Sequence, residues 1–209
     1  MYTKQNFMDL WGPEGYLETF CGYKNRNGEL DSKEKIWERI IKPFENNRHV
    51  CLEIGPGGGV WTNSLSLKFS EVYAIDVIPR SDKLNNSIKY FEVDSFDYSC
   101  SNIPDNSMDF VFSFGVFCHL PNSANDEYVK NVKRVLKPGG NAVLMFADWD
   151  THPPLNEIED RLEYKEKPHG FGWFYMDKNI IDGIMKKYDI EYEDMLPDFR
   201  DRIIHFTKA

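Results

Sequence analysis

A glycine-rich turn after the first strongly apolar run constrains the fold more than any other feature of this chain. The run HVCLEI (49–54) is typical of a short buried strand, and Gly55, Gly57 and Gly59 follow it directly. The next segment, VWTNSLSLKF, is compatible with a helix. Glycines let the backbone approach a ligand closely, and the start of a helix offers free N–H groups to an anionic group. The order strand, turn, helix therefore predicts a ligand site at the carboxyl end of the strand.

Further strands alternate with helices along the first two thirds of the chain. A helix from Asp31 or Ser32 to Pro43 precedes the turn, and a second, with Ser123 and Asp126 as its cap, runs to the sequence KPGG at 137–140. The other strands are predicted at VYAID (72–76), YFEV (90–93), MDFVFSFGVF (108–117) and NAVLMFA (141–147). This alternation predicts a parallel sheet with right-handed crossovers.

The last third follows a different pattern. Asp177 is placed to cap a helix, and IEYEDM (190–195) and RIIHFT (202–207) are separated by a turn, as in a hairpin. Between the fifth strand and that helix, residues 148–175 contain prolines, glycines and many charges, which is typical of an excursion from the core. An antiparallel addition to the sheet edge is expected.

Acidic residues at the strand ends indicate what kind of ligand the turn holds. Asp76 ends the second strand, from which a carboxylate can reach both hydroxyls of a ribose. The dinucleotide fingerprint GxGxxG would require glycine where Val60 stands, which disfavours an NAD-dependent oxidoreductase. The Glu53 carboxylate would also repel a pyrophosphate and attract an ammonium group. A nucleoside that carries a cation is the favoured ligand.

These motifs occur in an order that resembles a known enzyme family. CLEIGPGGGVWT, VYAID, FEVDSF, MDFVFSFGVFCHL and RVLKPGG, over about residues 49–147, are similar to the motif series of class I S-adenosylmethionine-dependent methyltransferases. The resemblance implies an α/β fold with a seven-stranded, mostly parallel sheet, helices on both faces and an antiparallel C-terminal hairpin. It implies S-adenosylmethionine as cofactor. The single domain would comprise an N-terminal segment (1–48), a cofactor-binding core (49–147), a substrate cover (148–175) and the final helix and hairpin (176–209).

The resemblance also assigns cofactor contacts position by position. Glu53 would orient the turn and the amino group of the cofactor, Asp76 would accept both ribose hydroxyls, and Asp94 would accept from the adenine amino group. For Glu53, a structural role within the loop is the alternative. Trp61 and Thr62 are expected in the core and on the helix surface. The other implied contacts are Gly55, Gly57 and Gly59 at the turn, Val77 and Ile78 on adenine, Ser95 beside Asp94, and Ser113, Phe114 and Gly115 under the sulfonium.

Methyl transfer needs an aligned acceptor and, for some acceptors, a base. His119 is the candidate base because it follows the fourth strand and has a suitable pKa; packing at the start of the next helix is the alternative. Asp148, Asp150 and His152 have ligand types and spacing compatible with a divalent ion, but a polar strand end is favoured and no metal is expected. Aromatic residues and histidines outside the core are expected to form a lid over the acceptor: Tyr16, Tyr23, Trp149, His152, His169 and Trp173.

Composition disfavours several kinds of partner. With 34 acidic and 25 basic residues the net charge is −9, which disfavours binding to nucleic acid and to anionic membranes. Asp9 and polar neighbours occupy the start of the chain, where a signal peptide would need an apolar stretch, so a cytoplasmic protein is expected.

The predicted function is methylation of a small molecule, with an oxygen acceptor on a sugar or phosphorylated metabolite slightly favoured over nitrogen. Methylation of a protein side chain and a non-catalytic cofactor-binding protein remain alternatives, and the sequence leaves the oligomeric state open.

Overall fold

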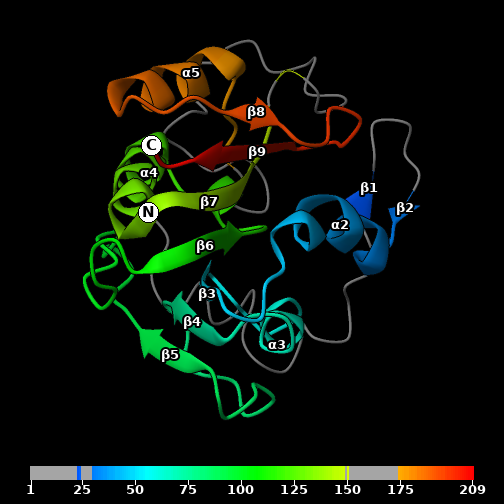
Figure 1. Cartoon of the computed structure of the whole chain (residues 1–209). Coiled ribbons are helices and arrows are strands. Elements are labelled where there is room, and N and C mark those ends of the chain that lie inside the picture. Colours follow the sequence, from blue (N-terminus) through cyan, green and yellow to red (C-terminus); the bar gives the residue numbers. More distant parts are fainter. Residues whose placement is uncertain (1–22, 25–29, 149, 151–173) are drawn as a thin grey trace.

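A seven-stranded sheet forms the centre of the protein (Figure 1). The computed structural model describes residues 23–24, 30–148, 150 and 174–209. The strand order is β5-β4-β3-β6-β7-β9-β8; β3 to β7 pair in parallel, β9 is antiparallel to β7, and β8 is antiparallel to β9. The strands are β3 (Val50–Ile54), β4 (Glu71–Asp76), β5 (Lys89–Glu92), β6 (Met108–Ser113), β7 (Leu136–Phe146), β8 (Glu193–Asp194) and β9 (Arg202–Thr207). The predicted fold, including its C-terminal hairpin, is confirmed.

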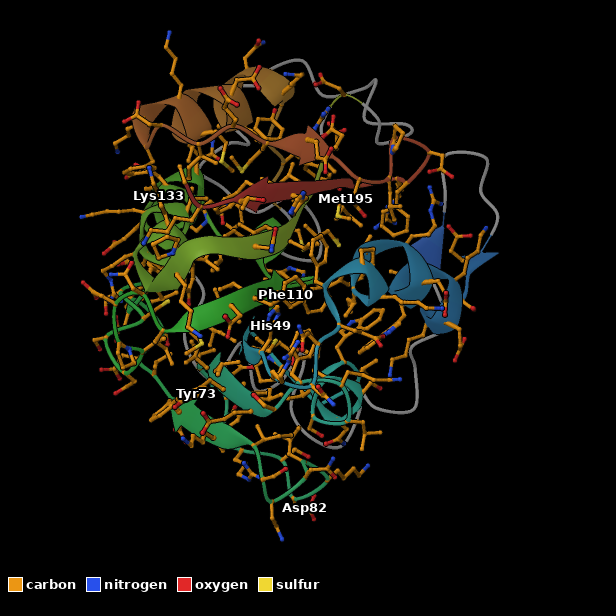
Figure 2. All side chains as sticks on the ribbon, in the orientation of Figure 1. His49, Tyr73, Asp82, Phe110, Lys133 and Met195 are labelled. Atoms are coloured by element: carbon orange, nitrogen blue, oxygen red, sulfur yellow. The ribbon has the colours of Figure 1, made fainter. Side chains whose placement is uncertain are left out.

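Helices cover both faces of this sheet, and each face has its own apolar core. Leu52 of β3 packs in the layer that contains α4 (Asn122–Val135) and α5 (Lys178–Lys187), whereas its neighbour Cys51 packs in the layer of α2 (Lys33–Ile40) and α3 (Thr62–Leu65). Successive strand residues face opposite sides, so a strand buried on both faces is apolar along most of its length. Phe110 of β6, at the centre of Figure 2, is 1% exposed and stacks on Phe44 with 5.1 Å between ring centroids.

The helix caps agree with the sequence at two ends and differ at a third. The Ser32 side chain accepts from the Lys35 amide, and the Asp177 side chain accepts from the Ile180 amide at 2.9 Å. The predicted cap of Ser123 and Asp126 is wrong. Helix α4 has Pro121 as its N-cap without a side-chain bond, and the Asp126 carboxylate accepts from Lys187 Nζ of α5 at 2.5 Å. A tertiary ion pair has replaced the local cap.

Three predicted boundaries also move. Helix α4 ends at Val135 and β7 begins at Leu136, so the sequence KPGG belongs to the strand, because Met108 of β6 already pairs with Leu136. Strand β6 ends at Ser113, since Gly115 has a φ of +75° and the short 3-10 helix η2 (Phe117–His119) follows. Helix α3 is one turn long, and a second 3-10 helix, η1 (Lys42–Phe44), follows α2.

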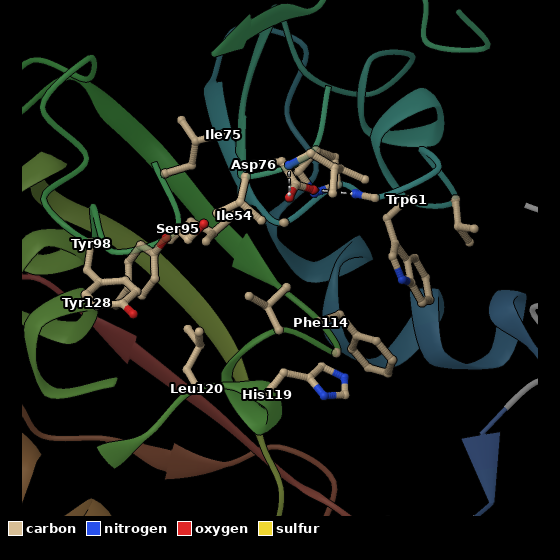
Figure 3. A pocket seen from close by; sticks show the side chains of 18 residues that line it. Ile54, Trp61, Ile75, Asp76, Ser95, Tyr98, Phe114, His119, Leu120 and Tyr128 are labelled. Atoms are coloured by element: carbon tan, nitrogen blue, oxygen red, sulfur yellow. Dashed lines mark hydrogen bonds between the residues drawn. The ribbon is translucent and has the colours of Figure 1, made fainter. Parts of the chain in front are cut away.

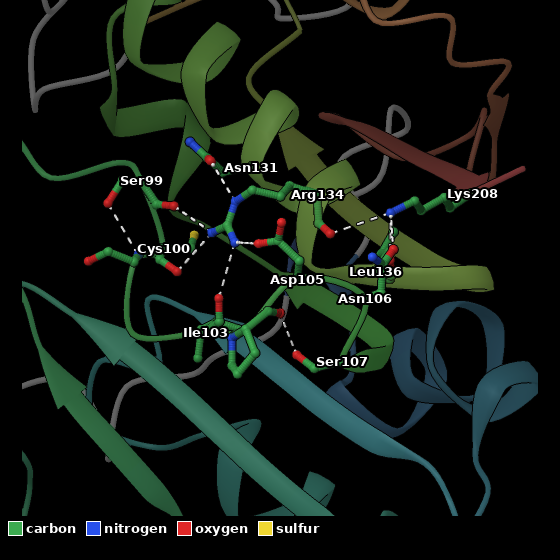
Figure 4. A network of polar contacts seen from close by, with 12 residues as sticks. Ser99, Cys100, Ile103, Asp105, Asn106, Ser107, Asn131, Arg134, Leu136 and Lys208 are labelled. Carbon is green, nitrogen blue, oxygen red and sulfur yellow. Dashed lines mark hydrogen bonds and ion pairs between the residues drawn. The ribbon is translucent and has the colours of Figure 1, made fainter.

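Arg134 joins the last turn of α4 to the loop that enters β6 (Figure 4). Its guanidinium donates to the carbonyl oxygens of Ser99, Cys100 and Ile103 at 2.9, 3.0 and 3.2 Å. A planar cation with several donors suits such a cluster of carbonyls.

A small antiparallel pair, β1 (Tyr23–Lys24) with β2 (Leu30–Asp31), was not expected from the sequence. Within the part of the chain that the structure describes, none of the helices has the length and apolarity that crossing a bilayer requires.

Candidate cofactor and acceptor site

The glycine turn follows β3, the strand at which the strand order of the sheet reverses. From β3 the chain adds β4 on one side, and later β6 pairs with β3 on the other, which opens a crevice at the carboxyl ends of these strands. Gly55 has a φ of +72°, and a Cβ atom there would lie 2.2 Å from Cγ2 of Val116. Its amide donates to the Ile75 carbonyl at 2.8 Å. Glycine is required here both for the left-handed backbone and for the close approach of the β6–α4 loop.

A cavity at this crevice brings together many of the residues singled out from the sequence (Figure 3). They come from the turn, from the end of β4, from the loop after β5 and from the loop after β6, which are far apart in the chain. Those that line the cavity are Gly55, Gly57, Asp76, Val77, Ile78, Ser95, Phe114, Gly115 and His119. The parallel topology explains the convergence, because carboxyl ends of parallel strands meet at one edge.

Asp76 holds the turn and faces the cavity. Its Oδ2 accepts from the Gly57 amide at 2.9 Å and its Oδ1 accepts from the Ile78 amide at 3.2 Å. Burial raises the pKa of Asp76 to about 6, while these backbone hydrogen bonds act to lower it. At neutral pH the group is an ionised acceptor fixed by two amides. Such a carboxylate is suited to accept from a pair of hydroxyl groups.

Glu53 lies beneath the turn and does not line the cavity. It is 2% exposed, and its Oε2 has no hydrogen-bond partner among the residues the structure describes. Burial raises its pKa to about 8, and Asp76 adds to the rise. A buried acceptor without a partner favours a cation or donor close by. This observation fits a cofactor with an ammonium group, held through the turn or through water.

Three other predicted contacts do not line the cavity. Gly59, at a φ of +88°, is in close contact with Leu84, where a Cβ would lie 2.5 Å from Cδ2. Ser113 is fully buried and donates to the Ile54 carbonyl at 3.0 Å, which ties β6 to β3. Asp94 is exposed, and its carbonyl accepts from the Asp97 amide in a turn at 2.9 Å. The role of Asp94 toward adenine stays a prediction.

Aromatic side chains complete the cavity at two ends, and among them the sequence assigned only Phe114 to the site. Trp61 and Phe114 lie at one end with ring centroids 5.2 Å apart, and Tyr98 and Tyr128 lie at the other, also 5.2 Å apart (Figure 3). Tyr128 belongs to the apolar stripe of α4, and Trp61 is only 5% exposed. Sequence patterns therefore indicate core residues at both positions. The other unassigned lining residues are Ile54, Pro56, Val60, Ile75, Val116 and Leu120.

His119 is the titratable residue of η2 that reaches the cavity, near Phe114 (Figure 3). Asp148 Oδ2 is paired with Arg202 at 3.0 Å, and its Oδ1 accepts from the Asp150 amide at 2.9 Å. For Tyr23 the structure describes only the backbone, which pairs with Asp31. The remaining predicted lid residues, Tyr16, Trp149, His152, His169 and Trp173, lie outside the described residues.

Comparisons with known proteins agree with this geometry. Residues 52–144 match the family model of a methyltransferase domain. Phosphoethanolamine N-methyltransferase 1 of Triticum aestivum is 29% identical over 124 aligned residues, and the match covers 56% of this chain and 25% of the wheat protein. The chain thus matches about a quarter of that relative's length. EEF1A lysine methyltransferase 2 of Homo sapiens is 27% identical over 177 aligned residues, and the match covers 74% of this chain and 72% of the human protein.

Solved structures share the fold at low sequence identity. Phosphoethanolamine N-methyltransferase 2 of Haemonchus contortus, in complex with phosphomonomethylethanolamine and S-adenosylhomocysteine, has a TM-score of 0.66 and 18% identity, covering 100% of this chain and 60% of that one. Geranyl diphosphate C-methyltransferase of Streptomyces coelicolor A3(2), also with S-adenosylhomocysteine, has a TM-score of 0.65 and 10% identity, covering 99% and 97%. Together with the strand order, these findings show that residues 52–144 form a methyltransferase domain and that the chain has the fold of the class I S-adenosylmethionine-dependent methyltransferases.

Proposed function

We propose that this protein transfers a methyl group from S-adenosylmethionine to an oxygen or nitrogen atom of a small molecule. The observation that carries the proposal is one cavity with the Asp76 carboxylate and the glycine turn on one side and His119 on the other. S-adenosylmethionine supplies an electrophilic methyl group on a positively charged sulfur. The protein then has to bind the donor, align the acceptor with the methyl group and exclude water.

Each residue has a defined task in this proposal. Asp76 accepts from the ribose hydroxyls, and Val77 and Ile78 pack against the adenine. Trp61 and Phe114 give the other end of the cavity aromatic faces, which favour a cation. His119 takes the proton that the acceptor loses as its new bond to carbon forms. The relatives named as N-methyltransferases support a nitrogen acceptor beside the oxygen acceptor favoured from the sequence.

Methylation of a protein side chain is the second candidate. It is favoured by the match to the human EEF1A lysine methyltransferase 2, which covers about three quarters of this chain, 74%. A protein substrate would need an open groove at the acceptor end, whereas a small molecule would be enclosed.

One experiment separates these functions. The purified protein is incubated with methyl-labelled S-adenosylmethionine and either a pool of small metabolites or a protein extract freed of metabolites. We expect S-adenosylhomocysteine to accumulate with the metabolite pool, and label to appear in a small product. Label in protein would favour the second candidate. Binding of S-adenosylhomocysteine without turnover in either mixture would indicate a non-catalytic cofactor-binding protein.

A further inference from the structure

Lys33 reaches from the helix that precedes the sheet to one wall of the cavity. Its Nζ donates to the carbonyl oxygen of Val60 and, at 2.8 Å, to the hydroxyl of Ser64. Val60 lines the cavity, and Ser64 belongs to α3. One ammonium group therefore joins the two ends of the segment 60–64, which contains Trp61.

Trp61 is held from α2 by two side chains. Lys33 Nζ lies 5.5 Å from the centroid of the Trp61 ring, and the Trp37 ring is stacked on the same indole with centroids 6.4 Å apart. Lys33 and Trp37 are four residues apart on a helix, so they project from one face. Trp61 in turn packs against Phe114 across the cavity end. The position of this wall thus depends on α2, which lies outside the matched domain.

The electrostatic setting of Lys33 is unusual for a lysine at a surface helix. The residue is half-buried, and burial lowers its pKa, whereas the nearby carboxyls of Glu34 and Glu53 raise it. A lysine can normally extend its ammonium group into water, so an inward orientation has to be compensated by partners. The carbonyl, the hydroxyl, the indole face and the Glu53 carboxyl provide that compensation.

We propose that Lys33 is a positioning residue of the cofactor site, which holds Val60 and Trp61 in the arrangement that binds the amino-acid portion of S-adenosylmethionine. The inference rests on the proposed function, which places the ribose at Asp76 and the adenine at Val77 and Ile78. The end with Trp61 and Phe114 then remains for the rest of the cofactor (Figure 3). Lys33 acts through the turn and touches no reacting atom.

The affinities for two ligands, measured by calorimetry, test this role. S-adenosylhomocysteine has the amino-acid portion, whereas 5′-methylthioadenosine keeps only the adenosine and the sulfur. We expect Lys33→Met to weaken the binding of S-adenosylhomocysteine about tenfold. The affinity for 5′-methylthioadenosine should stay within about twofold of the wild-type value. Lys33→Arg keeps a cation with several donors and is expected to restore the affinity to within about threefold. Lys42→Met, which removes an exposed lysine paired with Glu38, is the matched control and should change neither ligand.

The outcomes that contradict the inference are distinct. Unchanged affinity for S-adenosylhomocysteine in Lys33→Met would overturn it, and so would an equal loss for both ligands, because general damage would explain that result. If Lys33→Met fails to fold in a thermal melt, Ser64→Ala removes one of the two acceptors and must still weaken S-adenosylhomocysteine selectively, by about threefold. A wild-type protein that binds neither ligand would overturn the proposed function, and this inference with it.

Discussion

Replacing Asp76 by asparagine is expected to stabilise the unliganded protein and to weaken cofactor binding. The folded-state pKa of Asp76, about 6, lies above its ordinary value of 3.8 because the carboxyl is buried. The folded protein therefore holds the proton more tightly than the unfolded chain does. The stability that this carboxyl contributes is present below about pH 4 and is lost as the pH rises through about 6. At pH 8 the folded protein carries an ionised carboxylate at a cost.

The magnitude follows from the two pKa values. Their separation corresponds to at most about 3 kcal/mol, at 1.36 kcal/mol for each pKa unit. Asparagine removes the charge but can accept from only one of the two amides, Gly57 and Ile78, which costs about 1 kcal/mol. We expect a net gain of about 1 to 2 kcal/mol in the free energy of unfolding at pH 8, and no gain at pH 4. Loss of charged hydrogen bonds to the ribose should lower the affinity for S-adenosylhomocysteine by about 10- to 100-fold.

Urea unfolding at pH 8 and pH 4 measures the first effect, and calorimetry with S-adenosylhomocysteine measures the second. Asp82→Asn is the control, since Asp82 is an exposed carboxylate at the outer edge of the molecule, beyond β4 (Figure 2). Asp76→Asn with lower stability at pH 8, or with unchanged affinity for the ligand, would refute the reasoning. The wild type should also lose affinity as the pH falls below about 6, where the carboxylate becomes protonated.

Further substitutions test the turn, the base and the caps. Gly55→Ala should weaken the binding of S-adenosylhomocysteine by about tenfold or more, since the alanine Cβ would clash with Val116. In the double variant, Val116→Ala should restore part of the lost affinity, which calorimetry measures. His119→Asn should lower kcat by about 10²- to 10⁴-fold with the affinity for S-adenosylhomocysteine nearly unchanged; an unaltered kcat would exclude the base. Asp177→Ala should cost about 1 kcal/mol in urea unfolding. Ser123→Ala, at the cap that does not form, should stay within about 0.5 kcal/mol, and a larger cost would contradict the observed start of α4.

Local patterns were sufficient for most of the fold. Strands β3, β4, β6 and β7 are buried on both faces, so their apolar runs stand out, and the Asp177 cap is a contact within one turn of helix. Boundaries were less predictable where a distant partner intervened. Lys187 of α5 binds Asp126, and pairing with Met108 takes Leu136 out of the helix.

The candidate site divides in the same way. The sequence alone determined the glycine turn and Asp76, because backbone conformation and strand-end position are properties of neighbouring residues. Only the tertiary structure decided that Tyr98, Tyr128 and Trp61 line the cavity, since an aromatic residue on an apolar stripe has the same local pattern whether it faces a core or a ligand. It also brought Lys33 against Val60, a contact between residues 27 positions apart that depends on how α2 packs on the sheet.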